Sequence, residues 1–65
     1  MQPHQERVVT EKSQLDEKIG KLRAFIGGDV FLTLPGDERA RLGCQLGHMQ
    51  GYSAVLGDRI AAFGE

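Results

Sequence analysis

Two apolar repeats, separated by a pair of glycines, most constrain how this 65-residue chain can fold. Within each repeat the residues recur at alternating spacings of four and three, which is typical of one buried stripe along an α-helix. We call these stripes the first seam and the second seam. The first seam contains Val8, Lys12, Leu15, Ile19, Leu22 and Ile26, and the second contains Leu42, Leu46, Met49, Ser53, Leu56, Ile60 and Phe63.

The first helix is predicted over about residues 3–26. Pro3 suits the first helical position, because that position needs no backbone N–H. Gly27 and Gly28 are expected to end the helix, since glycine readily adopts the left-handed conformation that follows many helices. Lys12 is the one charged residue on the first seam, and its long stem can carry the ammonium group to solvent.

The second helix is predicted over about residues 35–63, starting at Pro35, after a short apolar turn over 27–34 that plugs the end of the hairpin. So short a connection makes the two helices antiparallel, which gives an all-α two-helix hairpin in one domain over residues 1–65. The hairpin would be on the order of 35 Å long and one layer thick. The numbers of facing seam residues then sum to about 68, which pairs Ile26 with Leu42, Leu22 with Leu46, Ile19 with Met49, Leu15 with Ser53, Lys12 with Leu56, and Val8 with Ile60.

Small residues occupy another face of the second helix, which we call the glycine face. Each glycine inside a helix costs roughly 1 kcal/mol relative to alanine, so something must approach this backbone closely to offset that cost. A chain of this length has a thin core, and apolar residues such as Val9, Phe25 and Val55 would stay exposed on a single protomer. We therefore predict a compact homo-oligomer that packs along Gly43, Gly47, Gly51 and Ala54.

The composition excludes several classes of protein. A single cysteine rules out an intrachain disulfide, and no apolar run approaches the roughly 20 residues that cross a bilayer. A soluble protein of the cytoplasm without a membrane partner is therefore expected. The formal net charge of −1 argues against a DNA-binding hairpin, because such proteins work by neutralising phosphates.

Catalytic and metal-binding patterns are sparse. We find no Walker loop, no dinucleotide fingerprint and no convergent nucleophile, base and orienting group, so no enzyme activity is predicted. Cys44 and His48 lie four apart on one helical face and could supply half of a metal site or an activated thiol. A structural zinc needs four ligands, so we predict no metal and no cofactor.

A polar stripe runs one residue behind the second seam and contains His48, Tyr52 and Arg59. With the predicted register, Tyr52 would lie beside Lys12, Leu15 and Asp16, and Arg59 would lie beside Arg7, Val8 and Lys12. An aromatic ring flanked by cations suits a nucleotide, because the ring stacks on the base and the cations bind the phosphate. The alternative is a solvated face in which Arg59 pairs with Glu11 and Tyr52 covers the edge of the core.

Motifs in both predicted helices match a known pattern: His4-Gln5, Arg7-Val8, Glu11-Lys12, Leu15, Lys18, Phe25-Ile26, Leu34-Pro35, Gln45, Met49, Tyr52, Leu56 and Arg59-Ile60. On these residues the chain resembles the small phage hairpin proteins of the anti-CBASS sponge family, whose hairpin domain also occurs in the anti-Thoeris sponges. The resemblance implies a hexamer, built from dimers and trimers, that sequesters cyclic oligonucleotide signals of bacterial immunity without catalysis.

In that family a stacking tyrosine and a lysine near the N-terminal part hold cyclic dinucleotides, and cyclic trinucleotides bind where three protomers meet. This chain has no tyrosine in its first helix, and residues ahead of the hairpin are expected to be lacking, so the resemblance favours a cyclic trinucleotide. An oligomeric module that inhibits or scaffolds a host protein through the glycine face remains the alternative. The candidate ligand-binding residues are Arg7, Lys12, Lys18, His48, Tyr52 and Arg59.

Overall fold

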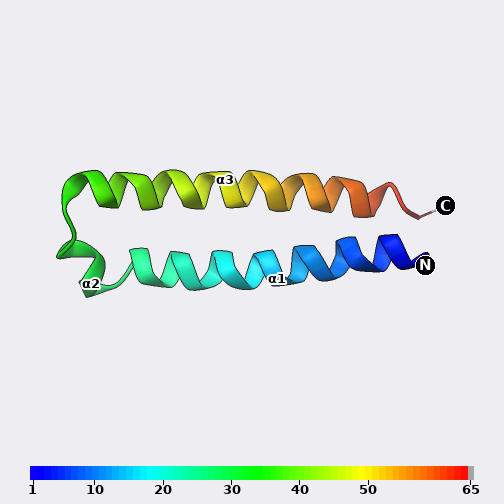
Figure 1. The fold of residues 1–65 in the computed structure, drawn as a ribbon, viewed down its shortest axis with the longest axis horizontal. Coiled ribbons are helices and arrows are strands. Elements are labelled where there is room, and N and C mark those ends of the chain that lie inside the picture. Colours follow the sequence, from blue (N-terminus) through cyan, green and yellow to red (C-terminus); the bar gives the residue numbers. More distant parts are fainter. Residues whose placement is uncertain (65) are drawn as a thin grey trace.

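The computed structural model describes residues 1–64, which form two long helices and one short one. Helix α1 spans Pro3–Ile26, α2 spans Asp29–Leu32 and α3 spans Gly36–Ala61. The long helices run antiparallel, so both termini lie at one end of a rod that measures 48 × 14 × 14 Å (Figure 1). The predicted all-α antiparallel hairpin is confirmed. Glu65, the last residue of the predicted domain, lies outside the described residues.

Helix α1 begins and ends at the residues that its local signals indicate. Pro3 takes the first helical position, and the backbone N–H of Gln2 donates to Oε1 of Gln5 at 2.9 Å, which ties the chain to the first turn. At the other end Gly27 donates its N–H to the carbonyl of Arg23 at 3.0 Å. The expected left-handed glycine is wrong, because Gly27 has φ −81° and the chain turns directly into the next helix.

The connection between the long helices contains α2, a single helical turn. Its end is fixed by Thr33, whose hydroxyl donates to the carbonyl of Val30 at 2.6 Å. Phe31 is half-buried and meets Phe25 edge to face, with ring centroids 6.4 Å apart. Val30 and Leu32 are 61% and 69% exposed, so the turn covers the end of the hairpin with Phe31 and leaves two apolar side chains in solvent.

Helix α3 starts at Gly36, one residue later than predicted. Pro35 has an extended ψ of 150°, and its carbonyl accepts the first helical hydrogen bond from the N–H of Arg39 at 3.0 Å. Proline therefore precedes the helix as its cap instead of forming its first residue. The first turn carries an acidic pair that binds Arg41: Nε lies 2.8 Å from Oε1 of Glu38, and Nη1 lies 3.7 Å from Oδ2 of Asp37.

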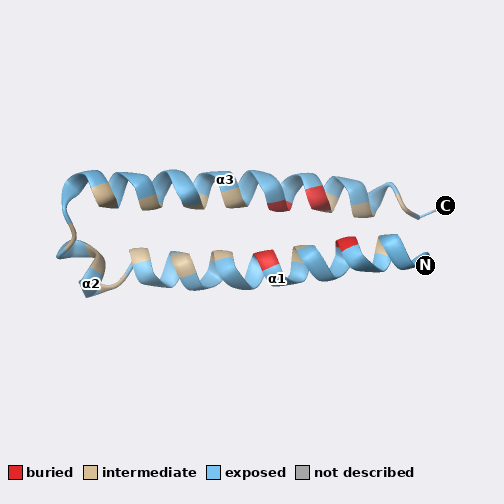
Figure 2. Ribbon diagram, viewed as in Figure 1, coloured by how far each residue is buried: buried red, intermediate tan, exposed pale blue. Residues whose placement is uncertain are grey.

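The core lies along the line where α1 and α3 face each other, and its buried residues gather in the half nearer the termini (Figure 2). Leu56, at 1% exposed, is the most completely buried side chain, and Val8 and Leu15 join it. Ile19, Met49, Ile60 and Phe63 pack against this cluster. Every residue of both predicted seams is buried or half-buried, so the two seams are confirmed as the packing faces.

The remaining surface includes exposed apolar side chains and the glycine face. Val9, Phe25 and Val55 are exposed, as predicted for a single protomer. A Cβ built on Gly43, Gly47 or Gly51 would meet nothing within 4 Å, so the glycine face points into open space on this chain. No helix within residues 1–64 is both long and apolar enough to cross a membrane.

Candidate functional site

A polar network between the two long helices orders the residues around it. Nζ of Lys12 donates to Oδ2 of Asp16 at 2.8 Å and to Oγ of Ser53 at 3.0 Å. The Ser53 hydroxyl donates in turn to Oδ1 of Asp16 at 2.5 Å. Ser53 is 8% exposed, whereas the Lys12 and Asp16 side chains are 30% and 47% exposed. The network therefore closes over a buried hydroxyl at one edge of the core.

Electrostatics follow from this geometry. The hydrogen bond from Lys12 lowers the pKa of the Asp16 carboxyl, and the hydrogen bond from Ser53 lowers it further, against a smaller opposing effect of desolvation. Asp16 is therefore held as a carboxylate, and it neutralises the ammonium group beside it. Lys12, one of the predicted phosphate contacts, already has two partners within the protomer.

The network also reports the axial register. A Cβ placed on Gly57 would lie 3.4 Å from Cε of Lys12, so Lys12 sits between Ser53 and Gly57 on the opposite helix. Leu56 lies between those two positions, and the predicted register pairs it with Lys12. The contacts agree with the predicted register.

The two edges of the helix pair carry different residues. Asp16 follows the core residue Leu15, Gly57 follows the core residue Leu56, and both lie on the edge where Lys12 is bound. We call this edge the lysine flank. Successive residues of an α-helix are about 100° apart, so a residue that precedes a core residue points to the other edge. Tyr52 precedes Ser53 and lies on that other edge, which we call the tyrosine flank.

Two adjacencies expected from the sequence are therefore wrong. Tyr52 does not lie beside Lys12 and Asp16, because Ser53 and the core separate the two flanks. Arg59 precedes Ile60 and lies on the tyrosine flank as well, away from Lys12. The predicted register along the helix axis agrees with the contacts. Residue numbers that sum to 68 give only the position along that axis, however, and do not show on which edge of the helix pair a residue lies.

Five of the six candidate ligand-binding residues share the tyrosine flank by this rule. Each precedes a seam residue by one position, and the two helices contribute both a ring and cations. Arg7 and Lys18 come from α1, and His48, Tyr52 and Arg59 come from α3. Helical geometry thus puts these five toward one edge, whereas Lys12, bound to Asp16 and Ser53, lies at the other.

The side chains of the tyrosine flank are open to solvent. Tyr52 is 46% exposed, and Arg7, Lys18, His48 and Arg59 are exposed. In the described part of the chain, none of the three cations Arg7, Lys18 and Arg59 forms an ion pair. The alternative pairing of Arg59 with Glu11 is thus not found among the described ion pairs, and these three cations remain available to another partner.

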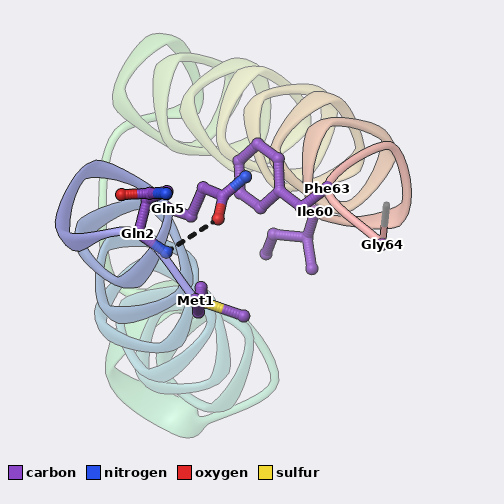
Figure 3. A pocket seen from close by; sticks show the side chains of 6 residues that line it. All are labelled: Met1, Gln2, Gln5, Ile60, Phe63 and Gly64. Atoms are coloured by element: carbon purple, nitrogen blue, oxygen red, sulfur yellow. Dashed lines mark hydrogen bonds between the residues drawn. The ribbon is translucent and has the colours of Figure 1, made fainter.

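Two hollows occur elsewhere on the described surface, and sequence reasoning missed both. One lies at the open end of the hairpin and is lined by Met1, Gln2, Gln5, Ile60, Phe63 and Gly64 (Figure 3). The other lies on the outer surface of α1 and is lined by Pro3, Glu6, Arg7, Thr10, Glu11 and Gln14. Neither contains Tyr52 or Arg59, but Arg7 lines the second hollow, so this residue of the tyrosine flank also borders the outer surface of α1. No sequence signal marks the first hollow, because it depends on how the chain leaves α3.

Cys44 and His48 are the residues considered as half of a metal site. Cys44 is exposed as a free thiol, one turn from His48. Among the side chains that the structure describes, no three His, Cys, Asp or Glu residues are grouped so that they could hold a metal ion.

Comparison with known proteins gives one family. The family model described as Sequestin matches residues 2–62, which cover both long helices and the connection between them. No curated protein and no solved structure matches the chain.

Proposed function

Because this chain belongs to the Sequestin family, we propose that it captures a cyclic oligonucleotide messenger of bacterial immunity and holds it without cleaving it. Sequestin is a phage protein that sequesters signalling molecules. Family membership therefore implies a binding protein and not an enzyme. The chemical class of the ligand and its mode of binding are our proposal.

The observation that carries the proposal is the tyrosine flank. Tyr52 offers an exposed ring, and base stacking on such a ring is worth roughly 1–3 kcal/mol per base. Arg7, Lys18 and Arg59 are exposed and make no ion pair in the described part of the chain, so they are free to bind phosphate through charge-assisted hydrogen bonds. A ring between cations suits a nucleotide better than it suits an apolar ligand or a metal ion.

Symmetry supplies what one protomer lacks. A single tyrosine flank is open and has one aromatic ring, whereas a cyclic trinucleotide has three bases and three phosphates. Three copies of Tyr52 and Arg59 around a symmetry axis would match that ligand. We therefore propose a homo-oligomer, with a hexamer favoured, that packs along Gly43, Gly47, Gly51 and Ala54. A cyclic trinucleotide is preferred over a dinucleotide, because the first helix has no tyrosine.

One observation favours a second candidate. The glycine face meets nothing on its own chain, and a groove of this kind also accepts a helix from another protein. In that case the assembly would bind a host protein, and nucleotides would change neither the stability of the assembly nor its binding to that protein.

Sequestration without cleavage has a direct test. Purified protein is mixed with a cyclic trinucleotide, the protein-bound fraction is removed by filtration, and the ligand is then released by denaturation and weighed by mass spectrometry. We expect depletion of free ligand and full recovery of the intact ring. Arg59→Ala should leave the ligand free, whereas Arg39→Ala, an exposed cation near the other end of α3, should deplete it normally. Recovery of a linear product, or no depletion at all, would overturn the proposal.

A further inference from the structure

The only polar residue of the first seam meets the only polar residue of the second. Lys12 and Ser53 interrupt two otherwise apolar repeats, and Nζ of one lies 3.0 Å from Oγ of the other. Asp16 accepts hydrogen bonds from both and completes the network. Within residues 1–64, the side-chain hydrogen bonds that join α1 to α3 all end on the Ser53 hydroxyl.

Apolar contacts alone do not select one offset between two such helices. A seam with alternating spacings of four and three repeats every seven residues, so it matches itself again after a slip of that length. A slip of seven residues would remove both Lys12 and Asp16 from the buried Ser53 hydroxyl and so break the charged network that binds it. Ile19 and Arg23, or Gln5 and Val9, would take their places. Buried polar contacts of this kind fix register in coiled coils.

We propose that the network of Lys12, Asp16 and Ser53 sets the axial offset of α1 and α3, and that Ser53 is a positioning residue for the ligand. This inference rests on the proposed function. Arg7 and Lys18 lie on α1, and Tyr52 and Arg59 lie on α3. The distance between the Tyr52 ring and the cations of α1 that would bind phosphate therefore depends on that offset. Ser53 reaches the ligand only through the residues that it aligns, because it faces the opposite edge of the core.

The offset itself can be read in solution without any ligand. Cε of Lys12 lies beside the α-protons of Gly57, and a nuclear Overhauser effect between the Lys12 side chain and Gly57 reports the native register. We expect this signal in the unmodified protein and in Ser53→Thr, which keeps the hydroxyl. In Ser53→Ala this Overhauser signal should be lost, or weakened because only part of the protein keeps the native register. Persistence of the full signal in Ser53→Ala would overturn the inference.

Ligand affinity gives the second readout. Ser53→Ala should bind a cyclic trinucleotide about tenfold more weakly, as expected for loss of the hydrogen bonds that align the site, whereas Ser53→Thr should bind normally. Ile19→Val serves as the matched control, because it thins the same core without touching a polar group and should keep the affinity. Equal losses in Ser53→Ala and Ser53→Thr would show that side-chain volume matters and the hydroxyl does not, which contradicts the inference.

The two claims fail in different ways. If the unmodified protein binds no nucleotide, the proposed function and the ligand part of this inference fall together, and the Overhauser signal alone decides whether Ser53 sets the register. If the unmodified protein binds and Ser53→Ala keeps both its signal and its affinity, the proposed function stands and the positioning role is refuted.

Discussion

Lys12 and Ser53 are 41 residues apart in the sequence, yet Nζ of Lys12 lies 3.0 Å from Oγ of Ser53 across the two helices. This contact divides the hairpin into two edges with different chemistry. One edge holds a neutralised network with Asp16, and the other presents Tyr52 and exposed cations that have no ion pair within the described residues. The charge that is available to a ligand therefore lies on the side away from the contact.

Leu56→Ala should unfold much of the protein. Leu56 is 1% exposed at the centre of a thin core, and such truncations cost about 2–5 kcal/mol, which is comparable with the whole stability expected of so short a chain. Circular dichroism during urea titration measures the loss. Val55→Ala is the control, since Val55 is 56% exposed and its truncation should change stability by less than about 0.5 kcal/mol. Equal effects of the two variants would contradict the assigned core.

Asp16 should make the protein sensitive to acid. Lys12 and Ser53 lower the pKa of its carboxyl in the folded state, so the unfolded chain binds more protons there as the pH falls. The stabilisation is complete above the ordinary carboxyl pKa of about 3.9 and is lost as the pH falls through the folded-state value. The free energy of unfolding should therefore fall less steeply with decreasing pH, below pH 6, in Asp16→Asn than in the parent protein. Asp58→Asn, an exposed carboxylate outside the network, should keep the slope of the parent protein.

Gly47→Leu should break the predicted homo-oligomer. The glycine face is open on the protomer, so a leucine there strains nothing within the chain but would hold a neighbouring helix away. Light scattering should show a lower mass for Gly47→Leu and an unchanged mass for Gln45→Leu, which adds the same side chain two residues away on another face. An unchanged mass for Gly47→Leu would refute this interface.

Tyr52→Ala should weaken binding of a cyclic trinucleotide by the value of one stacking contact per base, roughly 1–3 kcal/mol. Tyr52→Phe keeps the ring and should retain most of the affinity, because the stacking face is unchanged. Isothermal titration separates the two variants. A phenylalanine variant as weak as the alanine variant would mean that the hydroxyl, and not the ring, carries the contact.

The sequence predicted the helices and their pairing well, because both depend on local patterns. Alternating spacings of four and three identify a buried stripe wherever they occur, and each seam residue is buried or half-buried. A short connection then leaves only an antiparallel arrangement. The short helix α2 was missed as a helix, because four residues are too few to show a period.

The candidate site was harder to predict, because it depends on which side of a helix pair each residue occupies. Register arithmetic places Tyr52 level with Asp16, but it cannot distinguish the two edges of the interface. That distinction required the contact of Lys12 with Ser53 and Gly57. The bond between the two polar seam residues was missed for the same reason, since the arithmetic paired Lys12 with Leu56 and Ser53 with Leu15.

The most direct measurement is a thermal-shift titration of the purified protein with cyclic trinucleotides and dinucleotides, with linear nucleotides and ADP-ribose as controls. A ligand that binds only the folded state raises the melting temperature in proportion to its affinity and concentration. We predict a shift with cyclic trinucleotides at micromolar concentration, a smaller one or none with dinucleotides, and none with the controls. A shift with ADP-ribose alone would contradict the proposed ligand class, and no shift with any of these nucleotides would contradict nucleotide binding at the tyrosine flank.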